Sequence, residues 1–331
     1  MRAVHCPAYG PPETLEIREV PRPSPGPREI LVRTLATTVT SGDWRVQSGT
    51  FPRGFGLLAR LVLGVRGPRQ PILGTELSGI VEGVGAEVTR FRVGDEVVAF
   101  TDASMGCHVE GKCFPEDGPV VKKPARLSFA EAAALSFGGT TALDVFRRAG
   151  LAAEDEVLVN GASGGVGTAA VQLAKAAGAR VTAVCSAENA ALARSLGADR
   201  VIDYRTLDFT TDPARYDIVV DVVGTAPYAR SRQVLKPGGR VVLVLASLGE
   251  NLAALWEGRT AGHRVIAGPV SVRPADLAAL AALAETGKLR VVIDDVVAFE
   301  DIAAAYRRVA TGRKRGALVV AVDPSVTAPR G

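Results

Sequence analysis

Three glycines, Gly161, Gly164 and Gly167, are the first residues that point to chemistry. They lie in the stretch NGASGGVG (160–167), between an aliphatic run typical of a strand and a run with helical spacing. At such a junction, free backbone N–H groups and the positive end of the helix dipole attract a diphosphate. Glycine lets the backbone approach that group closely. A glycine-rich turn without a ligand is the alternative, but the complete βαβ pattern favours a dinucleotide-binding loop.

The end of the following strand indicates which coenzyme the loop would bind. A site for NAD would place an acidic residue there to bind the ribose 2′-hydroxyl. Ser186 occupies that position, and it brings no charge to repel a 2′-phosphate. Glu188 is close and weakens this argument unless its side chain points away. The sequence therefore predicts NADP(H) as cofactor. The predicted loop contains Gly161, Ala162, Ser163, Gly164, Gly165, Val166 and Gly167.

Two different textures along the chain indicate which elements must position the loop. Residues 1–123 contain short β-rich runs separated by Gly and Pro, which is typical of an antiparallel barrel or sandwich. From residue 124, strand-like and helix-like runs alternate, and the aliphatic strands show little polar alternation. This pattern predicts a doubly wound parallel sheet in an α/β fold. Ser128 and Glu131 are placed as a capping box for a helix over 128–150.

The last part of the chain returns to β texture after the helical run at 275–287. We expect this part to rejoin the N-terminal domain. The predicted division is therefore 1–123 with 286–331, and 124–285 as the dinucleotide-binding domain.

Composition excludes several other classes of protein. The 331 residues carry a formal net charge of +4 without a Lys/Arg block, and the short cluster at 313–315 is interpreted, with Arg307 and Arg308, as a solvated helix face. Nucleic-acid binding is therefore not expected. The first residues lack the apolar core of a signal peptide, and the apolar run at 55–65 is about half a membrane span. We expect a cytoplasmic protein with no membrane partner. Four cysteines in such a chain do not predict a disulfide framework.

Several blocks, in this order and spacing, resemble the medium-chain dehydrogenase/reductase superfamily, and within it the quinone oxidoreductase-like branch. The resemblance covers nearly the whole chain and implies a GroES-like catalytic domain around a Rossmann domain, with the active site in the cleft and a homodimer as assembly. The matching blocks are TSGDWRVQSGTFP (40–52), PILGTELSGIVEGVGAEVTRFRVGDEV (71–97), GGTTALDVF (138–146), VNGASGGVGTAAVQLAKAAGA (159–179) and LGADRVIDY (196–204).

The resemblance also implies how the 2′-phosphate of NADPH is held. Related NADPH enzymes use a hydroxyl residue after the second strand, a nearby basic residue and a tyrosine. Ser186 and Tyr204 match the first and third positions. The basic position corresponds to Asn189, so one cation is missing, and Arg205 is a candidate to replace it.

The same resemblance implies that no catalytic zinc binds. The family's cysteine ligand falls at Thr40, and the histidine of its GHE motif falls at Thr75. Each replacement removes a ligand that zinc requires. Cys107, His108 and Cys113 are closely spaced but lack a fourth partner, so a strand and loop with incidental thiols is the favoured interpretation over a metal site.

Without a Lewis acid, reduction of an activated acceptor remains feasible, whereas oxidation of a simple alcohol becomes difficult. A developing oxyanion or enolate needs hydrogen-bond donors, and the candidates are Thr40, Ser41 and Arg45. Asp43 is expected to have a turn and cap role. The nicotinamide pocket is expected near 40–43, at Thr141 in 139–142, and at Ala246 and Ser247 in 245–247.

The apolar segment 51–71 has two interpretations, a helix docked on its own domain or a lid over the substrate. The leading functional hypothesis is a zinc-independent, NADPH-dependent reductase of apolar quinones or α,β-unsaturated carbonyls. The alternatives are a carbonyl reductase or alcohol dehydrogenase on the same scaffold, and a non-catalytic NADP(H)-binding protein.

Overall fold

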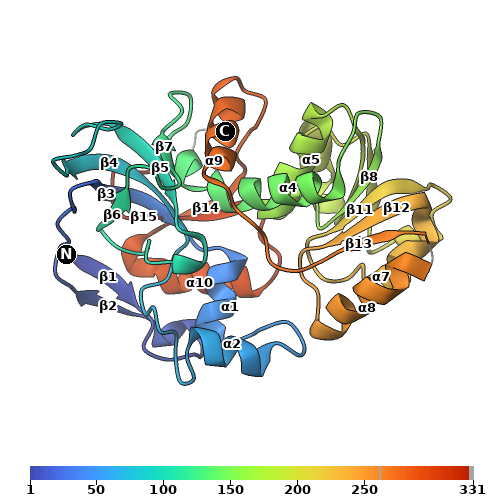
Figure 1. Ribbon diagram of the computed structural model, residues 1–331, viewed down its shortest axis with the longest axis horizontal. Helices are drawn as coiled ribbons and strands as arrows, with labels where there is room; N and C mark the ends of the chain where they lie inside the picture. The colour runs from blue at the N-terminus through green and yellow to red at the C-terminus, as the bar shows by residue number, and fades with distance from the viewer. Residues whose placement is uncertain (261, 328–331) are drawn as a thin grey trace.

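The computed structural model describes residues 1–260 and 262–327 and forms two lobes (Figure 1). The first lobe is built from the N-terminal and C-terminal parts of the chain. It contains a mostly antiparallel sheet and a small hairpin. Among the described residues, the sheet order is β14 (Ile293–Ala298), β15 (Ala317–Ala321), β3 (Glu29–Thr38), β4 (Glu76–Val84), β5 (Glu96–Phe100) and β7 (Val120–Lys122), with β6 (Gly111–Pro115) also on β3 and the hairpin formed by β1 (Arg2–His5) and β2 (Glu16–Glu19).

The second lobe is a parallel sheet whose strand order is that of the Rossmann fold. Numbered from its first strand, the order among described residues is 3-2-1-4-5-6. The strands in that order are β10 (Arg200–Asp203), β9 (Arg180–Cys185), β8 (Glu156–Asn160), β11 (Tyr216–Asp221), β12 (Leu235–Leu243) and β13 (Arg264–Ile266). The predicted α/β fold, a doubly wound sheet with a GroES-like domain, is confirmed.

Helices cover both faces of the parallel sheet, which explains the absence of polar alternation. Val157, Leu158 and Val159 of β8 are all fully buried, although successive side chains of a strand point to opposite faces. Burying each such side chain contributes roughly 1.5–3 kcal/mol. The helices are α1 (Ser41–Ser48), α2 (Gly56–Leu63), α3 (Phe129–Ala133), α4 (Ser136–Ala149), α5 (Gly165–Ala176), α6 (Ala190–Ser195), α7 (Tyr228–Ser231), α8 (Leu248–Thr260), α9 (Pro274–Glu285) and α10 (Ile302–Ala310).

The C-terminal strands β14 and β15 do join the sheet of the N-terminal lobe, where β15 pairs with β3. The strands of the parallel sheet all lie between the predicted boundaries at 123/124 and 285/286, and the strands of the other sheet lie outside them. The boundaries themselves stay a prediction.

The helical run predicted over 128–150 is two helices rather than one. The capping box is confirmed, because the Ser128 hydroxyl accepts from Glu131 N while the Glu131 carboxylate accepts from Ser128 N. The chain then turns and restarts as α4, whose first N–H groups face the other lobe: Phe137 N donates to the Glu76 carboxylate at 2.6 Å. The break is therefore a tertiary requirement that helical periodicity does not show.

Candidate active site

The glycine loop follows β8 at the point where the strand order reverses, the usual ligand position in such sheets. Gly161 has φ +87°, which L side chains rarely adopt, and its N–H donates to Val184 O at 3.1 Å. A Cβ on Gly167 would lie 2.1 Å from Gly161 O, so α5 packs against the turn only with glycine there. The first and last glycines of the predicted loop are therefore required by the fold itself.

The middle glycine has a different surrounding. Gly164 is the N-cap of α5 and, as a glycine, supplies no side-chain cap to the helix end. A Cβ on it would meet only Gly161 O at 3.6 Å, so the protein leaves room there. Free N–H groups of a helix first turn beside open space suit a diphosphate. Ala162, by contrast, is fully buried in the core and serves packing.

A cavity of about 580 Å³ opens beside this loop and gathers the residues expected to select the coenzyme. Ser186, Asn189 and Tyr204 all line it, together with Ser163 of the loop. The Asn189 amide donates to the hydroxyl groups of Ser163 and Ser186, each at 3.2 Å. The structure thus brings the candidate 2′-phosphate residues and the glycine loop to one cavity.

Glu188 also lines this cavity, and Arg205 pairs with it at 2.8 Å. The hydrogen bond from Arg205 lowers the pKa of Glu188. Because the guanidinium of Arg205 forms an ion pair with Glu188, it mainly neutralises the carboxylate that weakened the case for NADP(H) in the sequence.

Further cations come from the C-terminal segment, which sequence reasoning placed on a solvated helix face. α10 ends at Ala310, and the following turn brings Arg313, Lys314 and Arg315 to the cavity wall, along with Arg308 of the helix. Gly316 N donates to Ser163 O at 2.8 Å, which joins this segment to the glycine loop. The interpretation as a helix face is wrong for Arg313 and Arg315, which follow the end of α10 and line the cavity, whereas Arg308 is an exposed residue of the helix. The contact of this segment with the glycine loop of the other lobe is a tertiary feature that the sequence does not show.

A second cavity, of about 210 Å³, lies between the lobes and contains the predicted donors Ser41 and Arg45. Thr141 and Val166 also line it, and the Thr141 hydroxyl donates to Phe137 O at 2.7 Å. Arg45 is half-buried, burial lowers its pKa, and its Nε has no hydrogen-bond partner among the described residues. Because Arg45 lines the cavity, its guanidinium is a candidate donor to a ligand oxygen. Leu245, from the predicted stretch 245–247, is part of the apolar lining. The apolar lining not named from the sequence is Phe100, Phe137, Val222, Val244, Val270 and Val272.

Asp102 is a functional candidate that sequence reasoning missed. Of the described residues that line this cavity, Asp102 is the one with a carboxylic acid side chain. Burial raises its pKa, and its backbone has φ +47°, an uncommon value for a residue other than glycine. The sequence offered no signal for it, because the strained turn after β5 is visible only in the backbone.

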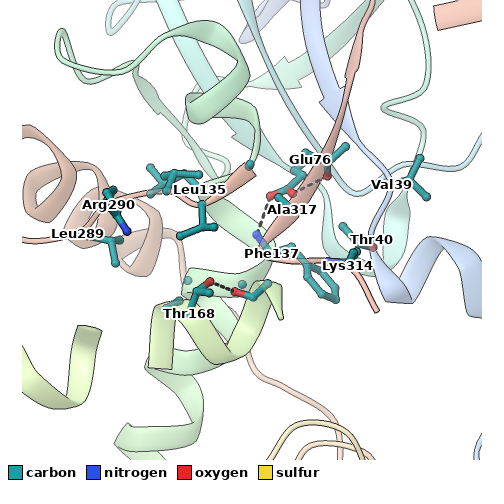
Figure 2. Close-up of a pocket in the computed structure, with 18 residues that line it drawn as sticks. Val39, Thr40, Glu76, Leu135, Phe137, Thr168, Leu289, Arg290, Lys314 and Ala317 are labelled. Atoms are coloured by element: carbon teal, nitrogen blue, oxygen red, sulfur yellow. Dashed lines mark hydrogen bonds between the residues drawn. The ribbon is translucent and has the colours of Figure 1, made fainter. Parts of the chain in front are cut away.

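Thr40 lines a different cavity from Ser41 and Arg45. Its hydroxyl donates to Asp43 Oδ2 at 2.7 Å, and the pair forms the capping box of α1, which confirms the cap role expected for Asp43. Thr40 lines a smaller cavity of about 40 Å³ that also contains Glu76, Phe137 and Lys314 (Figure 2). Its role as a donor to substrate stays a prediction.

Ala246 and Ser247 lie just beyond the cavity wall formed by Leu245. Ala246 is buried in the core, and Ser247 caps α8, since its hydroxyl accepts from Glu250 N at 3.2 Å. Their contact with a coenzyme also stays a prediction.

The donor set does not fit a zinc ion. Among the described residues, no group of three or more His, Cys, Asp or Glu side chains is arranged to hold a metal. Where the family has cysteine and histidine ligands, Thr40 and Thr75 are buried hydroxyl residues. Cys107 is fully buried, and its thiol pairs with the Thr101 hydroxyl at 3.4 Å.

A Rossmann lobe joined to a GroES-like lobe, with a diphosphate-type loop beside an interlobe cavity, defines a pyridine-nucleotide-dependent oxidoreductase. Residues 26–141 match the family model described as alcohol dehydrogenase GroES-like domain, and residues 196–320 match that described as zinc-binding dehydrogenase. The chain belongs to the medium-chain dehydrogenase/reductase superfamily, in its quinone oxidoreductase-like branch.

Individual relatives agree with this assignment over nearly full length. The chain is 31% identical to the chloroplastic quinone-oxidoreductase QR1 of Triphysaria versicolor, covering 97% of this chain and 98% of that protein. It is 29% identical to the 2-methylene-furan-3-one reductase of Solanum lycopersicum, covering 97% of this chain and 79% of that protein. The solved quinone oxidoreductase of Coxiella burnetii superposes with a TM-score of 0.86 at 28% identity, over 98% of this chain and 99% of that one.

Within the described residues, no helix has both the length and the apolar character needed to cross a bilayer.

Proposed function

We propose that this protein is an NADPH-dependent reductase that transfers hydride to a quinone or an α,β-unsaturated carbonyl without a metal ion. The observation that carries the proposal is the 210 Å³ cavity, which combines apolar walls with Ser41 and Arg45 and adjoins the glycine loop through Val166. The relatives named above act on a quinone and on a furanone, which supports this substrate class. Homodimer formation is proposed from the family resemblance, and the domain boundaries at 123/124 and 285/286 are proposed from the change of sequence texture together with that resemblance.

The bound coenzyme would supply the hydride, and the protein's residues supply position and charge. Amides at the α5 N-terminus hold the diphosphate. Arg45 and Ser41 face the cavity in which negative charge develops on the acceptor oxygen, and preorganised donors stabilise such charge strongly. Asp102 lines the same cavity and is the candidate to pass a proton to the reduced product.

Stopped-flow mixing with NADPH and 9,10-phenanthrenequinone, or with 1-octen-3-one, tests this function. We expect coenzyme oxidation at 340 nm in protein with less than stoichiometric zinc by elemental analysis. Asp102→Asn is expected to lower turnover of the enone by roughly a hundredfold if it is the proton donor. Absence of oxidation with either acceptor would favour the non-catalytic alternative, and a stoichiometric zinc needed for turnover would favour the alcohol dehydrogenase.

Coenzyme preference is expected to depend on the cavity beside Ser186. Ser186→Ala combined with Tyr204→Phe is expected to raise KM for NADPH and to spare NADH. Arg313→Gln combined with Arg315→Gln is expected to raise KM for NADPH by at least about tenfold to a hundredfold, since the loss of a single hydrogen bond to a charged group costs about 1.5–3 kcal/mol.

The matched control for the arginine pair is Arg307→Gln, because Arg307 pairs with Glu13 and is not part of the cavity wall. Steady-state kinetics with both coenzymes measures the effect. Equal losses for NADPH and NADH in the cavity variants would contradict 2′-phosphate recognition at this place.

A further inference from the structure

Helix α2 exposes its apolar side chains instead of burying them. Leu57, Leu58, Leu61 and Val62 have exposed fractions of 76%, 56%, 55% and 61%, and the helix has no buried residue. These four positions form one stripe along the helix. An amphipathic helix of a globular protein normally turns such a stripe to the core. Of the two interpretations of segment 51–71, a helix docked on its own domain therefore does not account for the apolar stripe of α2, and the lid stays a prediction.

Helix α8 of the other lobe has a similar exposed stripe. Leu248, Leu252 and Trp256 are spaced by four residues and have exposed fractions of 40%, 62% and 77%. Leu248 N donates to Arg53 O at 2.9 Å, which ties α8 to the loop that leads into α2. Both helices lie along the lower edge of the molecule in Figure 1. We call the combined surface the rim patch; it consists of Leu57, Leu58, Leu61, Val62, Val65, Leu252 and Trp256.

The charged residues of the segment that contains α2 have one sign. Between Asp43 and Glu76 the sequence contains no acidic residue. Four arginines of this stretch have exposed side chains, and none forms an ion pair with a side chain that the structure describes. One of them stacks on the ring of Tyr9. The four are Arg53, Arg60, Arg66 and Arg69.

We propose that the rim patch docks on the surface of an anionic lipid bilayer. Outward-projecting leucines flanked by arginines that pair with no carboxylate are typical of interfacial helices, whose apolar side chains enter the headgroup region while cations meet anionic lipid. Here Arg60 stacks on Tyr9 and Arg69 donates to Leu61 O at 2.9 Å, so both side chains are held beside α2 without a countercharge. A bilayer accepts projecting side chains without a complementary groove, which a protein partner would have to provide. The sequence predicted no membrane partner from the lack of a span, but a peripheral contact needs no span.

The inference rests on this surface alone and needs no coenzyme or substrate, so it is tested apart from the proposed function. The experiment is co-sedimentation of the full chain with POPC vesicles containing 30% POPG, and with pure POPC vesicles. We expect sedimentation with the anionic vesicles only, reduced at 0.5 M NaCl. Leu57→Glu combined with Leu61→Glu is expected to abolish it, and Arg53→Gln combined with Arg66→Gln to weaken it at least about tenfold.

Val93→Glu is the matched control, because Val93 has an exposed fraction of 61% but lies in the turn before β5, away from the patch. This variant should sediment like the unchanged chain. Circular dichroism melting of every variant establishes that it is folded. No sedimentation of the unchanged chain, or sedimentation that survives the leucine substitutions, overturns the proposal. A second copy is the occupant if vesicles do not bind and the leucine substitutions convert a dimer to a monomer in sedimentation velocity.

Discussion

Gly164→Val is expected to weaken binding of NADPH and NADH by roughly a hundredfold while leaving the fold intact. Its backbone angles, φ −81° and ψ 176°, are accessible to valine, and a Cβ there would have no protein atom nearer than 3.6 Å. The added side chain would therefore occupy the space proposed for the diphosphate. Losing two charge-assisted hydrogen bonds costs about 3 kcal/mol, which corresponds to that factor. Isothermal titration calorimetry with both coenzymes measures it.

Two other glycines separate this effect from general damage. Gly83→Val is the matched control, since a Cβ on Gly83 in β4 would have its nearest neighbour at 3.7 Å, and coenzyme affinity should not change. Gly167→Ala should destabilise the fold, because its Cβ would overlap Gly161 O at 2.1 Å. If Gly164→Val binds coenzyme normally with unchanged melting temperature, the diphosphate does not lie at this helix end.

Much of the Rossmann lobe could be predicted because its signals are local. The glycine spacing requires a tight turn at Gly161 and close packing at Gly167, and both requirements are met in the structure. The aliphatic strands follow from burial of both sheet faces, and the Ser128–Glu131 cap follows from the chemistry of a helix end. Each of these patterns is complete within a few residues, so the sequence contains the whole argument.

The parts that escaped prediction depend on residues distant in sequence. The Arg313–Arg315 cluster reaches the coenzyme cavity only because the C-terminal segment crosses back to the glycine loop, where Gly316 bonds to Ser163. Asp102 lines the second cavity and has a positive φ angle, a backbone conformation that its residue type does not predict. Thr40 was predicted as a donor beside Ser41, yet the same capping chemistry that begins α1 engages its hydroxyl. The sequence pattern identifies the helix cap formed by Thr40 and Asp43, but it does not show that the neighbouring Ser41 lines the cavity.

Glu76→Gln is expected to make the protein less sensitive to pH, because the Glu76 carboxyl group is buried where the two lobes meet. It accepts from the Thr38 hydroxyl and from Phe137 N in the small cavity that also contains Lys314 (Figure 2). Burial raises its pKa from 4.5 to about 7. A carboxyl with a raised folded-state pKa binds its proton more tightly when folded, so its stabilising contribution is complete below pH 4.5 and is lost as pH rises through 7.

The glutamine is uncharged throughout this range and, after an amide flip, offers an acceptor to Phe137 N and a donor to Thr38. The substitution should therefore change the free energy of unfolding differently at the two pH values. The difference between Glu76→Gln and the unchanged chain should shift by about 2–3 kcal/mol in favour of the variant's stability from pH 5 to pH 8. Urea unfolding at the two pH values measures this difference. Glu82→Gln on the same strand is the control: Glu82 is exposed and pairs with Arg22, so its difference between the two pH values should stay below about 0.5 kcal/mol. An advantage of Glu76→Gln that is equal at both pH values would mean that the carboxylate is already charged at pH 5, and that the Phe137 amide and the helix end behind it outweigh the cost of burial.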